Sequence, residues 1–291
     1  MTARSPAPCV GLVGATSQIG RTLVPHLQAQ GCRVLRISRN GAWTGSDPLH
    51  VHDASNACFV PPIEAADTLI SLAPLPAIGA VLDMAGLLGA RRVIAFGSTG
   101  RFSKANASSA VERDFVQQQE RAEQLLSSRA KDEGIAWTLL RPTMIYGAGA
   151  DQSVAFVMRM IERFGFFPLP WGARGLRQPV HVDDLAGACV AVLGEPRTHG
   201  RAYNLGGGEV LQFPELVRRV FLAAGRRPIL VPVPQFPYRM LVRLGRRIPS
   251  VRFVRMEMVD RMYQDLVADN SPAQIDFGYQ PRKFSPGQIC P

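Results

Sequence analysis

Residues 9–20 read Cys9-Val-Gly-Leu-Val-Gly14-Ala-Thr-Ser17-Gln-Ile-Gly20, which is the strongest fold signal in this chain. Positions 9–15 form a short apolar run that predicts a buried strand, and positions 18–30 have the amphipathic pattern of a helix. Between them, Gly14 allows a tight turn without a Cβ penalty, and Gly20 lets the helix pack close to the strand. The stretch therefore predicts a strand, a tight turn and a helix in direct succession.

The same alternation of short apolar runs and amphipathic segments continues through the first half of the chain. It predicts helices at 77–88 and 109–130, and further strands at 33–38, 49–51, 68–73, 92–96 and 136–141. Continuous apolar strands that alternate with helices are typical of a parallel sheet covered on both faces. We therefore predict an α/β fold, a Rossmann-type doubly wound parallel sheet with a smaller C-terminal substrate lobe.

The pattern changes after the last of these strands. Glycines and a segment rich in Pro, Gly and Trp at 167–175 interrupt the alternation, so we expect a second unit to begin there. The expected nucleotide-binding domain comprises 1–145 together with a return at about 178–203. The expected substrate lobe comprises the remaining pieces, at about 146–177 and 204–291.

Composition limits the class of protein and its partners. Of 291 residues, 46% are hydrophobic, which excludes disorder for most of the chain. The longest stretch without a charged residue, 5–20, is shorter than the roughly 20 residues that a membrane span needs. The net charge is +10 and arginine supplies most of the basic groups, with only three lysines. Because no nucleic-acid-binding signature accompanies this charge, we expect a small anionic substrate and no nucleic acid.

The five cysteines are scattered and contain no CxxC pair. Disulfide scaffolds and zinc sites both need closely spaced cysteines, so we expect no metal site. A reducing cytoplasm fits this usage, and we expect a cytoplasmic protein.

The glycine-rich turn also predicts a ligand. Backbone N–H groups at the start of the first helix would face a pyrophosphate, and the helix dipole would favour its negative charge. Dinucleotide folds hold the ribose 2′-hydroxyl with an acid at the end of the second strand, but here Ser38-Arg39-Asn40 has no carboxylate. Arg39 favours a 2′-phosphate, hence NADP over NAD, although an ordinary solvated arginine is the alternative.

Several short segments, in this order along the chain, together indicate one protein family. They are Gly14-Ala-Thr-Ser17-Gln-Ile-Gly20, Ser71-Leu-Ala73, Ser98-Thr99, Arg141-Pro142-Thr-Met-Ile-Tyr146 and His181-Val-Asp183-Asp184. Together they resemble the extended short-chain dehydrogenase/reductases, the superfamily of NAD-dependent epimerases and dehydratases. The resemblance implies an NAD(P) cofactor, with Asp53 contacting the adenine. The implied cofactor-binding residues are Gly14, Thr16, Ser17, Gln18, Ile19, Gly20, Arg39, Asp53, Ser71, Leu72, Ala73 and Gln119.

The chain departs from the family on the helix that carries the catalytic pair. The family has Tyr-x-x-x-Lys there, whereas alignment places Phe115 and Gln119 at those two positions. Phenylalanine has no proton to exchange and glutamine has no charge to lower a neighbour's pKa. Ser98 and Thr99 keep hydroxyl groups near the expected nicotinamide and are the candidate catalytic residues. Asp114 and Tyr146 are the next candidates.

The segment His181-Val-Asp183-Asp184 precedes an expected helix. The resemblance implies a packing role for His181 near the boundary of the lobe. We expect Asp183 or Asp184 to cap the helix that follows.

A basic segment at 226–256 contains eight arginines and no acidic residue. Arg239 and Arg243 alternate with apolar residues at helical spacing, and three interpretations stay open. They could bind the diphosphate of a substrate, a basic amphipathic helix could contact an anionic membrane, or the face could simply be solvated. We take Arg239 and Arg243 as candidate substrate-binding residues.

These observations predict an NAD(P)-binding protein that resembles nucleotide-sugar epimerases, dehydratases and reductases. Its expected chemistry is hydride transfer on an anionic, sugar-nucleotide-like substrate without the usual Tyr-x-x-x-Lys pair. The alternative is a non-catalytic dinucleotide-binding regulator or assembly subunit, which the substitution of the pair favours.

Overall fold

The computed structural model describes residues 7–38, 49–51, 65–105, 109–147, 154–245 and 256–289. Its main element is a seven-stranded sheet in the order β11-β6-β5-β4-β1-β2-β3, in which every neighbouring pair is parallel. The strands are β1 (Cys9–Val13), β2 (Arg33–Ser38), β3 (Leu49–Val51), β4 (Thr68–Ser71), β5 (Arg92–Phe96), β6 (Ala136–Pro142) and β11 (Arg201–Leu205). The prediction of a doubly wound parallel sheet is confirmed.

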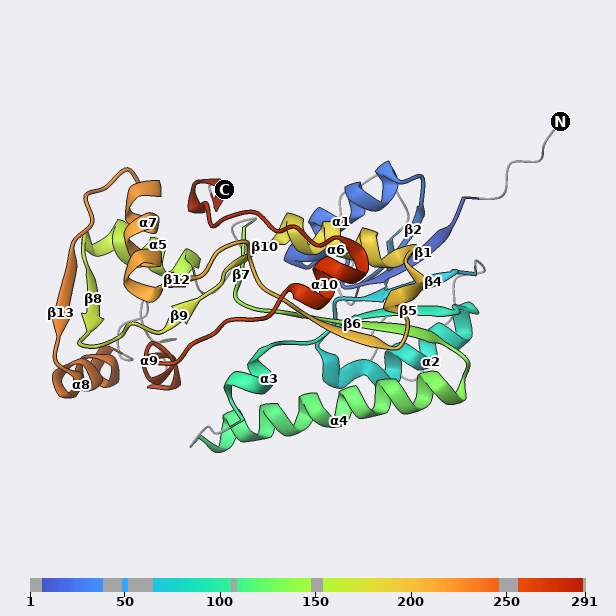
Figure 1. Ribbon diagram of the computed structural model, residues 1–291, viewed down its shortest axis with the longest axis horizontal. Helices are drawn as coiled ribbons and strands as arrows, with labels where there is room; N and C mark the ends of the chain where they lie inside the picture. The colour runs from blue at the N-terminus through green and yellow to red at the C-terminus, as the bar shows by residue number, and fades with distance from the viewer. Residues whose placement is uncertain are drawn as a thin grey trace.

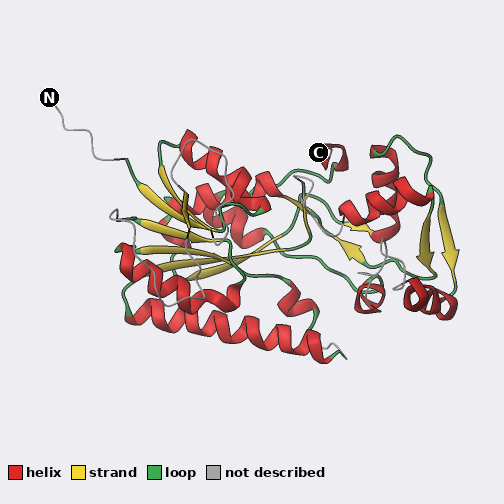
Figure 2. Ribbon diagram, turned by 180° about the vertical axis from the view of Figure 1, so that it is seen from behind, coloured by secondary structure: helices red, strands yellow, loops and turns green. Residues whose placement is uncertain are grey.

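Helices cover both faces of this sheet, as Figures 1 and 2 show. One face carries α1 (Gln18–Ala29), α6 (Val182–Leu193) and α10 (Ser271–Phe277). The other carries α2 (Ile78–Leu88) and α4 (Ala110–Asp132). We call the sheet and these helices the sheet domain. Its strands are buried from both sides, which is why they are continuous apolar runs in the sequence.

The remaining elements form a smaller lobe with its own apolar core, on the left in Figure 1. Two short strand pairs lie in it: β8 (Phe167–Pro170) with β13 (Leu230–Val233), and β9 (Leu176–Arg177) with β12 (Leu211–Gln212). Its helices are α5 (Val154–Phe164), α7 (Phe213–Ala223), α8 (Gln235–Gly245) and α9 (Met256–Arg261).

The two parts are joined by β7 (Ile145–Tyr146), which pairs with β10 (Val180–His181). Short helical turns complete the fold: η1 (Leu75–Ala77), α3 (Gly100–Ser103), η2 (Pro196–Thr198) and η3 (Pro286–Ile289).

The C-terminal region departs from the expected division of the chain. The expected lobe included everything after residue 203, yet α10 packs on the sheet domain. The Tyr203 hydroxyl donates to Asp276 at 2.6 Å, and the Tyr279 hydroxyl donates to the carbonyl of Gly206 at 3.0 Å. The chain therefore returns from the lobe to the sheet domain before it ends.

Within the described ranges, none of the helices is both long enough and apolar enough to cross a lipid bilayer.

Candidate functional site

The turn between β1 and α1 has the geometry that its glycines predict. Gly14 has a φ of +82°, in the left-handed region, and its N–H donates to the carbonyl of Ile37 at 2.9 Å. A Cβ at Gly20 would lie 2.5 Å from the carbonyl oxygen of Gly14, so no larger residue fits there without moving the turn. The turn brings the start of α1 against the carboxyl end of β1, where doubly wound sheets bind their ligands.

Ser17 stands where a third glycine would complete the motif, and it caps the helix instead. Its side chain accepts a hydrogen bond from the Gly20 N–H at 3.1 Å. The other N–H groups of the first turn keep the positive end of the helix dipole available at this edge. The geometry fits the phosphates of a dinucleotide.

Of the other residues in the turn, one is buried and two have side chains at the surface or bonded to the next segment. Ile19 is a core residue, 9% exposed, so its side chain packs and only its backbone is available to a ligand. Thr16 is partly exposed on the turn. The Gln18 side chain donates to the carbonyl of Gly147, which ties the turn to the segment that leads into the lobe.

The end of β4 lies beside this turn. Ser71 is 3% exposed, and the Leu72 N–H donates to the carbonyl of Val13 at 3.0 Å. A Cβ on Gly14 would come within 3.2 Å of the Leu72 Cβ, so Leu72 and then Ala73 border the turn directly. The structure thus brings together the turn and the 71–73 segment. Arg39 and Asp53 lie outside the described residues.

Ser98 and Thr99 follow β5 at the same edge of the sheet. The Thr99 hydroxyl donates to the carbonyl of Pro142 at 3.1 Å, so its proton is committed to the backbone. The Ser98 hydroxyl accepts from the Gly100 N–H at 3.0 Å, and its own proton has no acceptor among the described residues. Of the two hydroxyl groups, Ser98 is better placed to donate to a ligand.

Phe115 and Gln119 lie one turn apart on the face of α4 that points toward the sheet. Gln119 is 5% exposed, and its side-chain oxygen accepts no hydrogen bond from the described part of the chain. Phe115 forms a cation–π contact with Lys104, whose ammonium nitrogen lies 4.1 Å from the ring centroid. Sequence reasoning missed Lys104 because it belongs to no motif.

A buried ion-pair network lies further along α4. Arg141 donates to both oxygens of Glu123, at 2.9 and 2.6 Å, and Arg101 donates to the same carboxylate. Burial lowers the pKa of Arg141. The network fixes the loop after β5 against α4 and β6.

The other candidate acid–base residues are poorly placed for chemistry. Asp114 is exposed and accepts from Gln118 on the outer side of α4. Tyr146 is fully buried, its hydroxyl accepts from the Ser285 N–H at 3.3 Å, and burial raises its pKa.

The cap of α6 differs from the prediction. His181, not Asp183 or Asp184, is the capping residue, and its Nδ1 accepts from the Asp183 N–H at 3.2 Å. The expectation was wrong because both aspartates lie inside the first turn, where Arg282 binds them at 3.1 and 2.8 Å. Burial is the main cause that lowers the pKa of His181, with a further contribution from Arg282.

One Tyr-x-x-x-Lys spacing does occur in the chain, from Tyr279 to Lys283. It follows α10 in a segment without helix, so the two side chains do not share a helical face. Tyr279 is 4% exposed, and its hydroxyl is bonded to the backbone of Gly206. This pair does not replace the catalytic pair of the family.

The described part of the arginine segment, 226–245, includes β13 and α8, which lie at the end of the lobe remote from the sheet domain in Figure 1. Arg239 is exposed and forms an ion pair with Asp260 of the neighbouring helix α9. Arg243 also lies on α8, and residues 246–255 lie outside the described part. The ion pair of Arg239 is a surface contact within the lobe, away from the β1–α1 turn.

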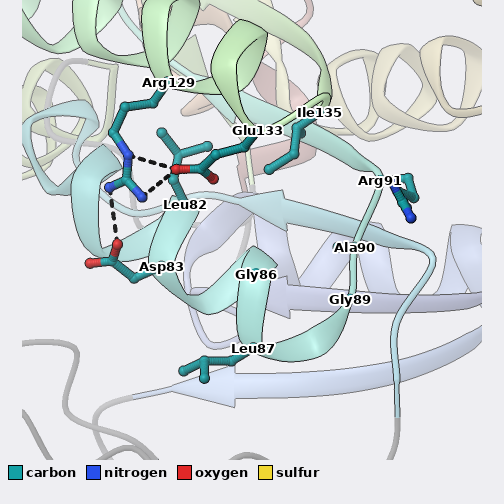
Figure 3. A pocket seen from close by; sticks show the side chains of 10 residues that line it. All are labelled: Leu82, Asp83, Gly86, Leu87, Gly89, Ala90, Arg91, Arg129, Glu133 and Ile135. Atoms are coloured by element: carbon teal, nitrogen blue, oxygen red, sulfur yellow. Dashed lines mark hydrogen bonds and ion pairs between the residues drawn. The ribbon is translucent and has the colours of Figure 1, made fainter.

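One open pocket of about 690 Å³ lies between α2 and the C-terminal end of α4, as Figure 3 shows. Arg129 crosses it and binds Asp83 at 3.0 Å and Glu133 at 2.9 Å. Because Arg91 and Ile135 precede strands β5 and β6, the pocket is at the amino edge of the sheet, opposite the turn. The chemistry-bearing residues described above do not line it.

Comparison with known proteins agrees with this arrangement. Residues 77–206, somewhat less than half of the chain, match the model of the NAD dependent epimerase/dehydratase family. A UDP-glucose 4-epimerase of Vibrio cholerae is 26% identical over 174 residues, which is 59% of this chain and 50% of that protein. The NADH dehydrogenase [ubiquinone] 1 alpha subcomplex subunit 9 of Arabidopsis thaliana is 28% identical over 158 residues, 50% of this chain and 39% of that protein. The alignments thus span half or less of these relatives.

Solved structures of this fold superpose over nearly the whole chain. MoeE5 in complex with UDP-glucose and NAD is 20% identical, with a TM-score of 0.71 and 94% of each chain covered. The UDP-N-acetylglucosamine 4-epimerase of Bacillus cereus is 13% identical, with a TM-score of 0.71, over 97% of this chain and 94% of that one. At these identities the likeness shows the fold. The predicted resemblance to the NAD-dependent epimerases and dehydratases is confirmed by the family match and by the similarity to a UDP-glucose 4-epimerase.

Proposed function

We propose that this protein binds a nicotinamide dinucleotide at the carboxyl edge of its sheet and acts as an oxidoreductase or epimerase on a nucleotide sugar. The observation that carries the proposal is the β1–α1 turn. Gly14 has a left-handed φ, Gly20 has no room for a Cβ, and Ser17 caps a helix whose N-terminus points to the ligand edge. This combination supplies both the space and the positive potential that a pyrophosphate needs.

The side chains of this edge have distinct roles in the proposal. The start of α1 holds the pyrophosphate, while Leu72 and Ala73 border the cofactor beside the turn. Gln119 occupies the helix position from which the family holds the nicotinamide ribose, and its amide can donate to a ribose hydroxyl. The bound dinucleotide supplies hydride acceptance and return, and the protein orients the substrate against it.

Two observations support a nucleotide sugar as substrate. Proteins similar to this chain include a UDP-glucose 4-epimerase and a structure holding UDP-glucose with NAD. The chain also has a net charge of +10, which favours anionic ligands over neutral ones. Arg39, which follows the acid-free end of β2, favours NADP, whereas the solved relatives MoeE5 and the UDP-glucose 4-epimerase of Thermus thermophilus are complexes with NAD.

The sharpest test exploits the cap at Ser17. Aspartate caps helices as well as serine does, so Ser17→Asp should fold normally while its charge repels a pyrophosphate. We expect its affinity for NAD or NADP, measured by calorimetry, to fall by about tenfold or more, which is roughly 1.4 kcal/mol. The matched control is Gln212→Asp, which adds the same charge at the exposed N-cap of α7 in the lobe.

The same titrations decide the cofactor. Tighter binding of NADP than of NAD, lost in Arg39→Ala, would support the preference that Arg39 suggests. If the wild-type protein binds neither dinucleotide at millimolar concentration, the proposed function is wrong.

A second candidate is a non-catalytic, dinucleotide-binding assembly subunit. Phe115 and Gln119 favour it, because neither side chain can exchange a proton. The similarity to a subunit of a mitochondrial NADH dehydrogenase points the same way. Dinucleotide binding without turnover of UDP-glucose or related sugars would favour this candidate.

A further inference from the structure

Three side chains converge on Gly100, just after β5. A Cβ built at Gly100 would lie 3.0 Å from the Ser98 hydroxyl, 3.4 Å from the Phe115 ring and 3.7 Å from Lys104 Cε. Lys104 follows the short helix α3, which packs on α4, and its side chain is 18% exposed. A primary amine, a hydroxyl and an aromatic ring therefore meet at the ligand edge of the sheet.

The charges around Lys104 come from two other elements. On α4, Glu112 Oε1 lies 3.9 Å from the Lys104 nitrogen. On α9 of the lobe, Arg261 Nε lies 3.6 Å from the same oxygen, so two cations share one carboxylate. Burial is the main cause that lowers the pKa of Lys104; Arg261 lowers it further, and Glu112 raises it. The environment thus eases loss of the ammonium proton.

The other titratable side chains described at this edge are engaged elsewhere. Glu123 is held by two arginines, and the Tyr146 hydroxyl is fully buried. His181 uses Nδ1 to cap α6, and its Nε2 is enclosed against Gly147. Among the described residues, Lys104 contacts an aromatic face and a carboxylate that lies beyond hydrogen-bonding distance, so its nitrogen can turn to a ligand without breaking a hydrogen bond to any of them.

We propose that Lys104 is the proton-transfer residue of this site, and that it acts from the ring face of Phe115. The inference rests on the proposed function. When a substrate alcohol is oxidised, its C–H bond breaks and the hydrogen leaves with both electrons to an oxidised nicotinamide. The O–H proton passes to the neutral Lys104 amine, and the C=O bond forms. In the reverse direction the Lys104 ammonium returns the proton to the carbonyl oxygen. The Ser98 hydroxyl donates to the same oxygen.

The first test measures Lys104 directly and needs neither substrate nor cofactor. The chain has only three lysines, Lys104, Lys131 and Lys283, so reductive ¹³C-methylation gives few NMR signals. Loss of one signal in Lys104→Arg assigns it. We expect the Lys104 signal to titrate at lower pH than dimethyl-lysine in a model peptide. Titration at or above the pH of the peptide would overturn the proposal.

The second test separates proton transfer from simple attraction of an anion. Arginine keeps the positive charge but does not lose its proton, so Lys104→Arg retains attraction and abolishes transfer. We expect both Lys104→Arg and Lys104→Met to lower kcat for oxidation or epimerisation of a UDP-sugar by about 10²–10⁴-fold. The dependence of kcat on the protonation of an amine should also disappear. The control, Lys131→Met, changes an exposed lysine at the far end of α4 and should leave kcat unchanged.

The failures of the two proposals are distinguishable. A protein that binds no dinucleotide overturns the proposed function. A protein that binds dinucleotide and turns over equally fast in Lys104→Met overturns only the role of Lys104. Full activity in Lys104→Arg would show that the charge alone matters. Wild-type protein that binds dinucleotide but has no turnover also overturns the role of Lys104, and it favours the subunit candidate.

Discussion

Two glutamates on the same face of α4 have opposite surroundings. Glu123 accepts hydrogen bonds from Arg141 and Arg101, with the Arg141 contacts at 2.9 and 2.6 Å. Glu112, about three helical turns earlier, is nearly as buried. Its Oε1 lies 3.6 Å from Arg261 Nε and 3.9 Å from Lys104 Nζ, beyond hydrogen-bonding distance. Its Oε1 accepts no hydrogen bond from the described residues. The Glu123 carboxylate is thus hydrogen-bonded by two arginines, whereas the Glu112 carboxylate is only near its cations.

The difference indicates that the ion pairs of Glu123 have a structural role, whereas those of Glu112 can rearrange. The two arginines that bind Glu123 come from α3 and β6, so this cluster fixes the loop after β5 against the sheet domain. Glu112 instead has one partner after α3 and one on α9 of the lobe. Charges that are close but not hydrogen-bonded can still exchange partners when a ligand arrives. Stability is therefore expected to depend on Glu123 and proton transfer on Glu112.

The largest effect on stability is expected for Glu123→Gln. The substitution keeps the shape but leaves the side chains of Arg141 and Arg101, 13% and 25% exposed, without their counter-charge. Removing one partner of a buried pair costs about 3–5 kcal/mol, and we expect the lower end here because Arg101 reaches solvent. Urea unfolding measures it. Glu120→Gln, an exposed neighbour 3.7 Å from Arg101, should change stability by less than about 1 kcal/mol. Equal losses of stability in Glu123→Gln and Glu120→Gln would show that the Glu123 network has no special structural role.

A smaller effect, visible mainly as a pH dependence, is expected for Glu112→Gln. The pKa of Lys104 is lowered in the folded protein from its usual 10.5, so the unfolded chain binds more protons between the lowered value and 10.5. Stability consequently rises with pH across that window. Removing Glu112 takes away the group that raises this pKa, so the window widens downward and the rise should start at lower pH.

Unfolding experiments between pH 7 and 10 measure this, with Lys104→Met as the reference background. In that background Glu112→Gln should no longer alter the slope, because the titrating amine is absent. A slope that changes equally in both backgrounds would mean that Glu112 acts on another group.

The smallest effect is expected for Arg239→Gln in the lobe. Arg239 and Asp260 are 51% and 46% exposed, and exposed pairs contribute about 0–1 kcal/mol. We expect less than about 1 kcal/mol of stability to be lost and no change in affinity for UDP-glucose. A tenfold loss of that affinity would instead support a diphosphate-binding role for this arginine.

The fold was predictable because its strands are buried on both faces. Apolar runs located β1, β2, β4, β5 and β6 to within two residues at each end. The glycine turn after β1 indicated which edge of the sheet would face a ligand. The return of α10 to the sheet domain was not predictable in this way. It depends on tertiary contacts such as the bond from Tyr203 to Asp276, which have no local sequence pattern.

The site was predictable only where a backbone requirement selects a residue type. Gly14 and Gly20 are needed for conformation and space, so the sequence exposes them. The cap of α6 was misassigned because His181 fills a position where aspartate is more common. Lys104 has no such constraint, and its approach to Phe115 depends on how α3 packs against α4. Its rarity among so many arginines was the one available signal.

The repeated passage of the chain between the two parts determines how the protein can be cut. After β11 the chain enters the lobe, returns as α10, and leaves again so that Phe284 packs beside Tyr146 in the lobe core. Cleavage of one connection by a protease would leave the halves joined by the others. A gene shortened before residue 271 would remove Asp276, the acceptor for the buried Tyr203 hydroxyl, from the sheet domain. A single cut of the chain therefore cannot separate the lobe from the sheet domain as two independent pieces.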